Sequence, residues 1–240
     1  MDFGILLAVV VITYLIGSVS FARIITKRLA PERDVTRFEI PVEGTDEHYR
    51  VLSIGANSVS SELGPMAGMM VSILDILKIV LPTLFCRLYF PEQPIYMLAA
   101  ALSGLSGHIW PIYYRFHGGS GFSAILGGLV VIDPLAVLVT PVAGFLLGMV
   151  VIRNLIVTSL AWIWLLIPWI WWRFEGNPFY IAYAVIINII FILAMVPEIK
   201  MARKYAKEGK YLEYGLGSLS SNPMGRGMLK IAKFFKVEVK

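Results

Sequence analysis

Long apolar runs separated by short polar segments make up most of the sequence. An α-helix rises 1.5 Å per residue, so about 20 apolar residues are needed to cross the roughly 30 Å hydrocarbon layer of a bilayer. Six runs approach or reach that length, and a seventh, at residues 122–132, falls well short of it. The pattern predicts an all-α integral membrane protein, with helices over residues 3–25, 64–90, 94–114, 122–132, 134–152, 155–173 and 178–196.

The basic residues between these runs predict which side of the membrane each segment faces. Residues 197–240 contain ten Lys or Arg and residues 26–63 contain five, whereas the turn at 91–94 contains none. Because cytoplasmic segments carry an excess of Lys and Arg, both basic segments are expected in the cytoplasm. With the N-terminus outside, the C-terminus reaches the cytoplasm only if residues 122–132 also cross the membrane. We therefore expect a seven-span helical bundle with a cytoplasmic-facing cleft and a cytoplasmic C-terminus.

The same pattern divides the chain into two parts. Residues 1–200 are predicted to form a transmembrane domain that includes a long cytoplasmic loop at 26–63, and residues 201–240 a basic cytoplasmic tail. The end of the tail carries lysines three residues apart, at Lys230, Lys233 and Lys236. Residues at this spacing share one helix face. A basic face suits a helix lying on an anionic leaflet, so we expect an interfacial helix in the tail.

Composition excludes several classes of protein. The chain is 58% hydrophobic and 15% charged, with a mean hydropathy of +0.74, which rules out an ordinary soluble domain. Its net charge of +5 gathers in the C-terminal tail, which indicates membrane lipids rather than nucleic acid as partners. The single cysteine, Cys86, excludes an internal disulfide. The three histidines lack the spacing of metal ligands, so neither a metal nor a cofactor is expected.

The most informative polar segment is a glycine loop at residues 118–121. Gly118, Gly119 and Gly121 occupy three of its four positions. Glycine lets backbone N–H groups approach a ligand closely, and successive N–H groups in such turns form concave sites for anions. A helix is expected to begin directly after the loop, and the dipole at its N-terminus also favours an anion. The loop is therefore a candidate phosphate site, with Ser120 where a basic residue would complete it.

Other polar residues lie within the apolar runs. Asp75 and Lys78 share one helix face, and ionisable groups at membrane depth either form a structural ion pair or take part in function. Ser18 and Asn188 have simpler explanations, as a serine bonded to its own helix backbone and an interhelical hydrogen bond. Spacing reveals no nucleophile–base pair and no Gly-x-Ser-x-Gly elbow, which argues against a covalent serine mechanism.

Four segments together resemble the bacterial acyl-phosphate-dependent glycerol-3-phosphate acyltransferase family. Residues 14–21 are similar to its first signature, residues 74–78 to its second helix, and residues 55–58 to its Gly-Ala-Thr-Asn. Residues 107–121 resemble its Gly-His…Pro…Phe-x-Gly-Gly-Lys-Gly signature with the spacing preserved throughout. The resemblance implies seven helices in a bacterial plasma membrane. It also implies an enzyme of phospholipid synthesis, which transfers an acyl chain from acyl phosphate to the C1 hydroxyl of glycerol 3-phosphate and yields lysophosphatidic acid.

The resemblance also suggests roles for individual residues. The candidate catalytic residues are Ser18, His108 and Ser120. The candidate phosphate-binding residues are Gly118, Gly119, Gly121, Lys27, Asn57, Ser58 and Arg115. Asp75 and Lys78 are expected to support the bundle beneath the site. Catalysis would then rest on orientation and electrostatic stabilisation rather than on a side-chain nucleophile.

Several positions differ from the family pattern, and they leave other functions open. The family lysine is Ser120, Thr-Asn is Asn57-Ser58, and the late His-Arg-x-Asn reads Met195-Val196-Pro197-Glu198. A hydrogen bond to a charged group contributes about 1.5–3 kcal/mol, so losing several would lower the rate by orders of magnitude. One alternative is a catalytically impaired relative that binds lipid or an anionic metabolite, or that partners another membrane enzyme. Another is a small transporter, which would require polar residues through the membrane depth or an inverted repeat.

Overall fold

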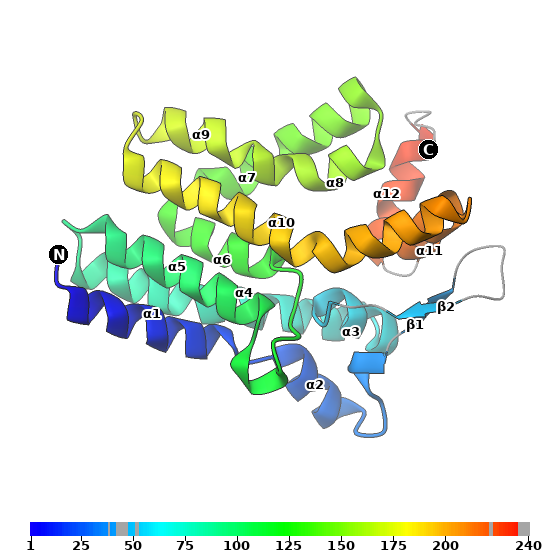
Figure 1. Cartoon of the computed structure of the whole chain (residues 1–240), viewed down its shortest axis with the longest axis horizontal. Coiled ribbons are helices and arrows are strands. Elements are labelled where there is room, and N and C mark those ends of the chain that lie inside the picture. Colours follow the sequence, from blue (N-terminus) through cyan, green and yellow to red (C-terminus); the bar gives the residue numbers. More distant parts are fainter. Residues whose placement is uncertain (38, 42–47, 51–52, 221–222, 235–240) are drawn as a thin grey trace.

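A computed structural model describes residues 1–37, 39–41, 48–50, 53–220 and 223–234. Helices make up almost all of its regular structure, which confirms the predicted all-α class (Figure 1). The α-helices are α1 (Phe3–Gly17), α2 (Phe21–Leu29), α3 (Ala56–Leu63), α4 (Pro65–Tyr89), α5 (Pro94–Ile109), α6 (Phe122–Ile132), α7 (Pro134–Leu146), α8 (Leu155–Trp164), α9 (Leu166–Arg173), α10 (Pro178–Lys207), α11 (Tyr211–Ser220) and α12 (Pro223–Phe234). Short helical turns lie at η1 (Val35–Arg37), η2 (Ile112–Tyr114) and η3 (Leu147–Ile152).

One short hairpin lies inside the long loop after α2. Strand β1 (Glu39–Pro41) pairs antiparallel with β2 (His48–Arg50), and Glu39 lies opposite Arg50. The hydropathy pattern did not predict this hairpin or α3, because both elements are too short and too polar to produce an apolar run.

Prolines and capping side chains determine where the long helices begin. Helices α4, α5, α7 and α10 each start at a proline, whose missing N–H would have no partner in the first turn. Asp2 accepts the N–H of Gly4 at 2.7 Å at the start of α1, and Asn177 accepts the N–H of Phe179 at 3.1 Å at the start of α10. These caps satisfy donors that no other group of the helix can satisfy.

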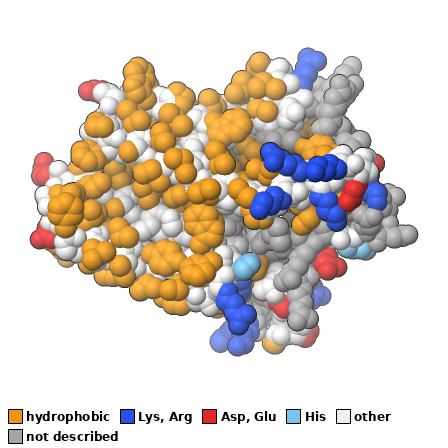
Figure 2. Space-filling view, viewed as in Figure 1, with side chains coloured by type: hydrophobic (Ala, Val, Ile, Leu, Met, Phe, Trp, Pro, Cys, Tyr) orange, Lys and Arg blue, Asp and Glu red, His pale blue; other side chains and the backbone are white. Residues whose placement is uncertain are grey.

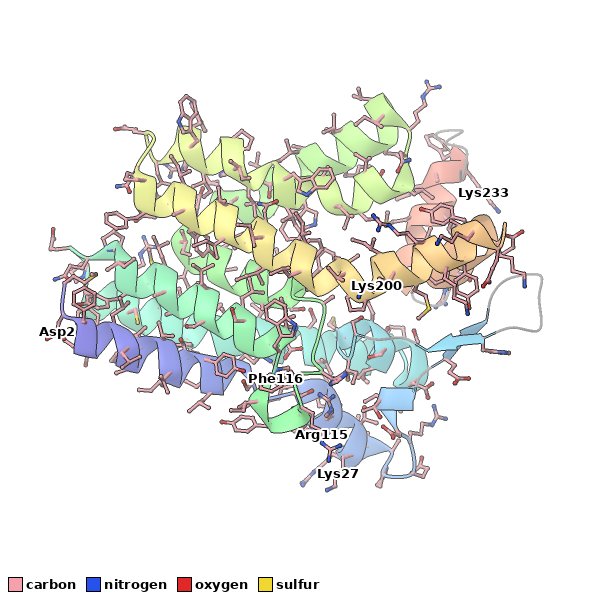
Figure 3. All side chains as sticks on the ribbon, viewed as in Figure 1. Asp2, Lys27, Arg115, Phe116, Lys200 and Lys233 are labelled. Atoms are coloured by element: carbon pink, nitrogen blue, oxygen red, sulfur yellow. The ribbon has the colours of Figure 1, made fainter. Side chains whose placement is uncertain are left out.

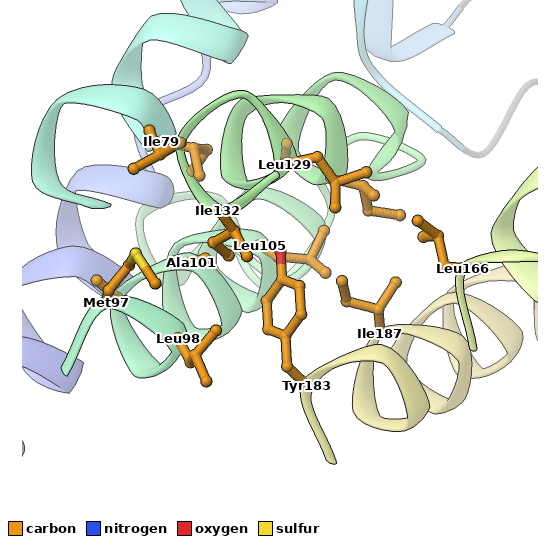
Figure 4. Close-up of a cluster of buried hydrophobic side chains, with 14 of the residues drawn as sticks. Ile79, Met97, Leu98, Ala101, Leu105, Leu129, Ile132, Leu166, Tyr183 and Ile187 are labelled. Atoms are coloured by element: carbon orange, nitrogen blue, oxygen red, sulfur yellow. The ribbon is translucent and has the colours of Figure 1, made fainter. Parts of the chain in front are cut away.

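Helices α4, α5, α6 and α10 build the centre of the bundle (Figure 4). Leu105 of α5, Leu129 of α6 and Ile187 of α10 are almost completely buried there. Helix α1 packs along α5, and a Cβ at Gly17 would overlap the backbone of Gly104. Glycine at this crossing therefore lets two backbones touch, as small residues commonly do between membrane helices. The crossing brings the end of α1 next to the end of α5.

Five helical stretches in the described part of the chain are long and apolar enough to cross a membrane. They are Phe3–Leu29, Pro65–Tyr89, Pro94–Tyr114, Pro134–Ile152 and Pro178–Lys207. Helix α6 is apolar but shorter, and the predicted run at 155–173 divides at Leu165 into α8 and α9. Figure 2 shows hydrophobic side chains covering one end of the molecule and Lys and Arg gathered toward the other. The integral membrane character is confirmed, whereas the count of seven spans stays a prediction.

The first predicted helix is interrupted between Gly17 and Phe21. Ser18 turns its hydroxyl back to the Tyr14 carbonyl at 2.8 Å, as expected for a serine in a membrane helix. Beyond the end of α1, the carbonyl of Val19 accepts a hydrogen bond from the side chain of Lys78 in α4. The interruption thus exposes backbone groups to partners on another helix, and these partners belong to the candidate site described below.

The C-terminal tail contains helices α11 and α12. Ala232 of α12 is buried against Met149 and Leu155, so this helix packs on the turn between α7 and α8. Helix α10 runs continuously to Lys207, so the predicted division of the chain at residue 200 lies within a helix. The contact of the tail with the membrane surface stays a prediction, and residues 235–240 lie outside the described part.

Candidate active site

Polar side chains from α4 and α5 meet inside the apolar bundle near the end of α5. Lys78 Nζ lies 2.8 Å from Asp75 Oδ1, and both side chains are only 4% exposed. His108 Nδ1 is 3.7 Å from the same carboxylate oxygen. Lys78 also donates to the carbonyl of Val19 at 2.6 Å. The paired charges therefore tie α4 to the break between α1 and α2, and they provide each other with the compensation that burial requires.

The glycine loop folds back onto the end of α5. Gly119 donates its N–H to the carbonyl of His108 at 3.1 Å. A Cβ on Gly119 would overlap the imidazole ring of His108, and a Cβ on Gly118 would overlap the same residue's carbonyl oxygen. Gly121 has a φ of +93°, a left-handed conformation that favours glycine. The glycines thus allow the loop to lie directly on His108.

Two helix N-termini adjoin this loop. Helix α6 begins at Phe122 directly after it. Helix α3 is brought alongside because Ile54, just before its start, donates an N–H to the carbonyl of Gly118 at 2.8 Å. A Cβ on Gly55, the N-cap of α3, would lie 3.9 Å from the Cα of Gly119. Both helix dipoles therefore favour an anion beside the loop.

Two cavities meet at Gly119. The first, which we term the lysine cavity, has a volume of about 10 Å³, close to the space that one water molecule needs. It is lined by Ser18, Val19, Ser20, Ile54, Asp75, Lys78, His108, Pro111 and Gly119. The second, which we term the glutamate cavity, has a volume of about 220 Å³. It is lined by Ser53, Ile109, Trp110, Phe116, His117, Gly118, Gly119, Ser120, Ala194, Met195, Pro197 and Glu198.

Comparison with known proteins identifies the family. Residues 7–204 match the family model described as glycerol-3-phosphate acyltransferase. The chain belongs to this family. Glycerol-3-phosphate acyltransferase of Mycoplasmopsis synoviae is 32% identical over 171 residues, which cover 66% of this chain and 70% of the relative. The relative of the same name in Myxococcus xanthus is 32% identical over 131 residues, which cover 55% of this chain and 62% of the relative.

The fold comparison agrees with the family assignment. Two crystal structures of PlsY, an integral membrane glycerol 3-phosphate acyltransferase, resemble the chain with TM-scores of 0.64 and 0.61. One is the glycerol 3-phosphate form and the other the lysophosphatidic acid form. Each is 24% identical, and the match covers 85% of this chain and 93% of PlsY. The matched segment spans about 60% of the length of several of the curated relatives. Together with its apolar spans, family membership makes this a multi-pass bacterial membrane protein.

The structure brings part of the predicted acyltransferase site together. Ser18 and His108 line the lysine cavity, Ser120 lines the glutamate cavity, and the glycine loop lies between them. Asp75 and Lys78 form a buried ion pair beneath the loop, and their supporting role stays a prediction. The Ser18 hydroxyl is engaged by the Tyr14 carbonyl and the N–H of Ile112, which lies 3.4 Å away.

Other predicted residues lie apart from the two cavities. Lys27, Arg115 and Asn57 are exposed and line neither one. Figure 3 labels Lys27 and Arg115 at the lower edge of the view, below the end of α5. Ser58 is buried, where its Oγ accepts the N–H of Gly55 at 3.0 Å and caps α3. It therefore positions the start of α3 beside the loop.

Two residues near the loop were not predicted as site residues. Arg23 of α2 donates from Nη2 to the carbonyl of His117 at 2.8 Å, and its guanidinium lies 4.3 Å from the centre of the Tyr114 ring. Arg23 thus brings a cation to the segment just before the loop, across 94 residues of sequence. Glu198 of α10 lines the glutamate cavity together with Ser120. Only its position in the altered family motif singled it out in the sequence.

Proposed function

We propose that this protein is a membrane acyltransferase of phospholipid synthesis. It transfers an acyl chain from an acyl phosphate to the C1 hydroxyl of glycerol 3-phosphate, and the products are lysophosphatidic acid and phosphate. The observation that carries the proposal is the glycine loop, held on the end of α5 between two helix N-termini in a chain of this family. Both substrates carry phosphate, which suits an anion site of this construction.

Each part of the site has a role in this reaction. We assign the phosphate contacts to the remaining loop N–H groups and the Ser120 hydroxyl, because the Gly119 N–H is already bonded to His108. His108 supports the loop through both its carbonyl and its ring. Lys78, paired with Asp75, lines the cavity beneath the loop and holds the Val19 carbonyl. Because these donors are held in place by the fold, they can stabilise the charge that develops during acyl transfer without having to reorganise. The site also orients the two bound substrates for the attack.

We also propose that this end of the bundle faces the cytoplasm, with the N-terminus outside. The concentration of Lys and Arg at the loop end supports this orientation (Figure 2). Because the single cysteine, Cys86, is buried, an introduced cysteine can be labelled without background. A membrane-impermeant maleimide on intact cells should label Glu92→Cys and leave Lys204→Cys unlabelled. Labelling of the second variant and not the first would reverse the orientation.

The proposed activity is tested with purified full-length protein, an acyl phosphate and glycerol 3-phosphate. Wild type should produce lysophosphatidic acid at a rate well above that of Gly119→Trp, whose side chain cannot be accommodated against His108. Equal rates for the two proteins would contradict the proposal. The folding of the variant is checked by its elution as a monodisperse species in detergent.

The same assay distinguishes the enzyme from a catalytically impaired relative. That alternative is not favoured, because the matched relatives are named as glycerol-3-phosphate acyltransferases. Ser120→Lys places a cation at the loop and should lower the KM for glycerol 3-phosphate by about tenfold, equivalent to about 1.4 kcal/mol of added binding. If wild type and Ser120→Lys bind glycerol 3-phosphate without turnover, the impaired relative gains support.

A further inference from the structure

Ser120 and Glu198, two of the positions that depart from the family motifs, both line the glutamate cavity. Ser120 stands where the family has a lysine, and Glu198 stands where it has an asparagine. The residues are 78 positions apart, yet both line this cavity, one from the glycine loop and one from α10. Relative to the family pattern, the cavity has lost a cation and gained a carboxylate. A phosphate group is therefore repelled from the α10 side, while a neutral hydroxyl is not.

Glu198 is the carboxylate in these two cavities that is available for chemistry. Asp75, in the lysine cavity, is bound to Lys78 and is almost completely buried. Glu198 is half-buried, and within the described residues no basic side chain forms an ion pair with it. Apolar side chains, including Trp110, Phe116 and Met195, line the same cavity. Unlike Asp75, Glu198 does not stabilise the fold through an ion pair among the described residues, and its carboxylate is free to accept a proton.

The other base in the cavity is His117. Its Nδ1 lies 2.6 Å from the carbonyl of Arg115, which can only accept, so Nδ1 carries the hydrogen. His117 is exposed, whereas Glu198 is partly enclosed. A general base has to be within hydrogen-bond reach of the hydroxyl that it deprotonates. The cavity of about 220 Å³ is large enough for a three-carbon polyol against Glu198.

We propose that Glu198 is the general base for the acceptor hydroxyl in the acyl transfer. The proposal rests on the proposed function. The phosphate of the acceptor lies toward the loop and the helix N-termini, and repulsion by the carboxylate turns its hydroxyl end toward α10. Glu198 takes the hydroxyl proton as the hydroxyl oxygen bonds to the carbonyl carbon of the acyl phosphate. The bond from that carbon to the phosphate oxygen breaks, and the proton passes from Glu198 to the departing phosphate.

The experiment compares Glu198→Gln with wild type in the lysophosphatidic acid assay. Glutamine keeps the size of the side chain and removes its basicity, so kcat should fall by at least about 100-fold. The KM for glycerol 3-phosphate should stay the same or decrease, because the variant no longer repels the phosphate. Glu208→Gln is the matched control: Glu208 caps the same helix and pairs at 4.0 Å with Lys204 on the surface. Its kcat should equal that of wild type.

Two further variants test whether Glu198 acts as a base or only lines the cavity. Glu198→Asp should retain more activity than Glu198→Gln, because it keeps a carboxylate, and all variants should unfold at temperatures close to wild type. A wild-type kcat in Glu198→Gln, or a large loss in His117→Gln with none in Glu198→Gln, would overturn the assignment of the base. An inactive wild type would instead refute the proposed function itself, and the proposal falls with it.

Discussion

Replacing Gly119 with alanine should reduce acyl transfer by at least about 100-fold while leaving the bundle folded. The added Cβ would overlap the imidazole ring of His108, at its Nε2 and Cε1 atoms. The ring has little freedom to move, because His108 is buried and its other nitrogen faces Asp75. The loop must therefore move away from α5. A displacement of about 1 Å at a catalytic centre can cost 100-fold in rate, since the substrates are no longer aligned.

A matched control exists on the neighbouring segment. Gly55→Ala introduces the same methyl group, but its Cβ would lie at an ordinary 3.9 Å from Gly119 and its φ of −160° suits any residue. This variant should keep activity within a few-fold of wild type. The double variant Gly119→Ala/His108→Ala removes the ring that the methyl group meets. If Gly119→Ala had wild-type kcat and KM, close packing of the loop on His108 would not matter for catalysis.

Replacing Lys78 with methionine should cause the largest loss of stability among the substitutions considered. Methionine fills similar space but leaves the Asp75 carboxylate buried without its cation, and it also removes the bond to the Val19 carbonyl. Breaking one partner of a buried pair typically costs about 3–5 kcal/mol. For a chain of this size that corresponds to a midpoint of thermal unfolding lowered by roughly 6–20 °C. Thermal unfolding in detergent measures the shift.

The charge balance can be tested separately from the loss of packing. In Asp75→Asn/Lys78→Met neither residue carries a charge, so much of the lost stability should return. Lys204→Met breaks an exposed ion pair with Glu208 and should change the midpoint little, because surface pairs contribute about 0–1 kcal/mol. A double variant no more stable than Lys78→Met would show that packing around Lys78, rather than compensation of Asp75, determines the loss.

Much of the bundle could be predicted from the sequence because its signals are local. An apolar run of sufficient length predicts a membrane helix whatever surrounds it. The three-residue spacing of Asp75 and Lys78 places both on one face and predicts their ion pair. Short elements lack such signals. The break at Ser18, the hairpin and α3 were missed because their bounds depend on contacts with distant segments, such as the bond from Lys78 to Val19.

The candidate site was predicted only in part, for the same reason. Motif spacing identified the glycine loop and His108, which are close together in the chain. It could not separate Lys27 and Arg115, which are exposed, from Arg23, which reaches the segment before the loop. These three residues are similarly basic in the sequence. Only the contacts of Arg23 with His117 and Tyr114, in the segment after α5, distinguish them.

The sequence by itself determined the membrane class, the family and the loop, since each is encoded in composition, period or spacing over a few residues. The tertiary structure decided how those pieces meet. It placed His108 directly against Gly119, and it brought Ser120 and Glu198 into one cavity. Such contacts depend on how α4, α5, α6 and α10 pack together. No pattern along the chain encodes that packing, because close contact between distant residues is a property of the folded bundle.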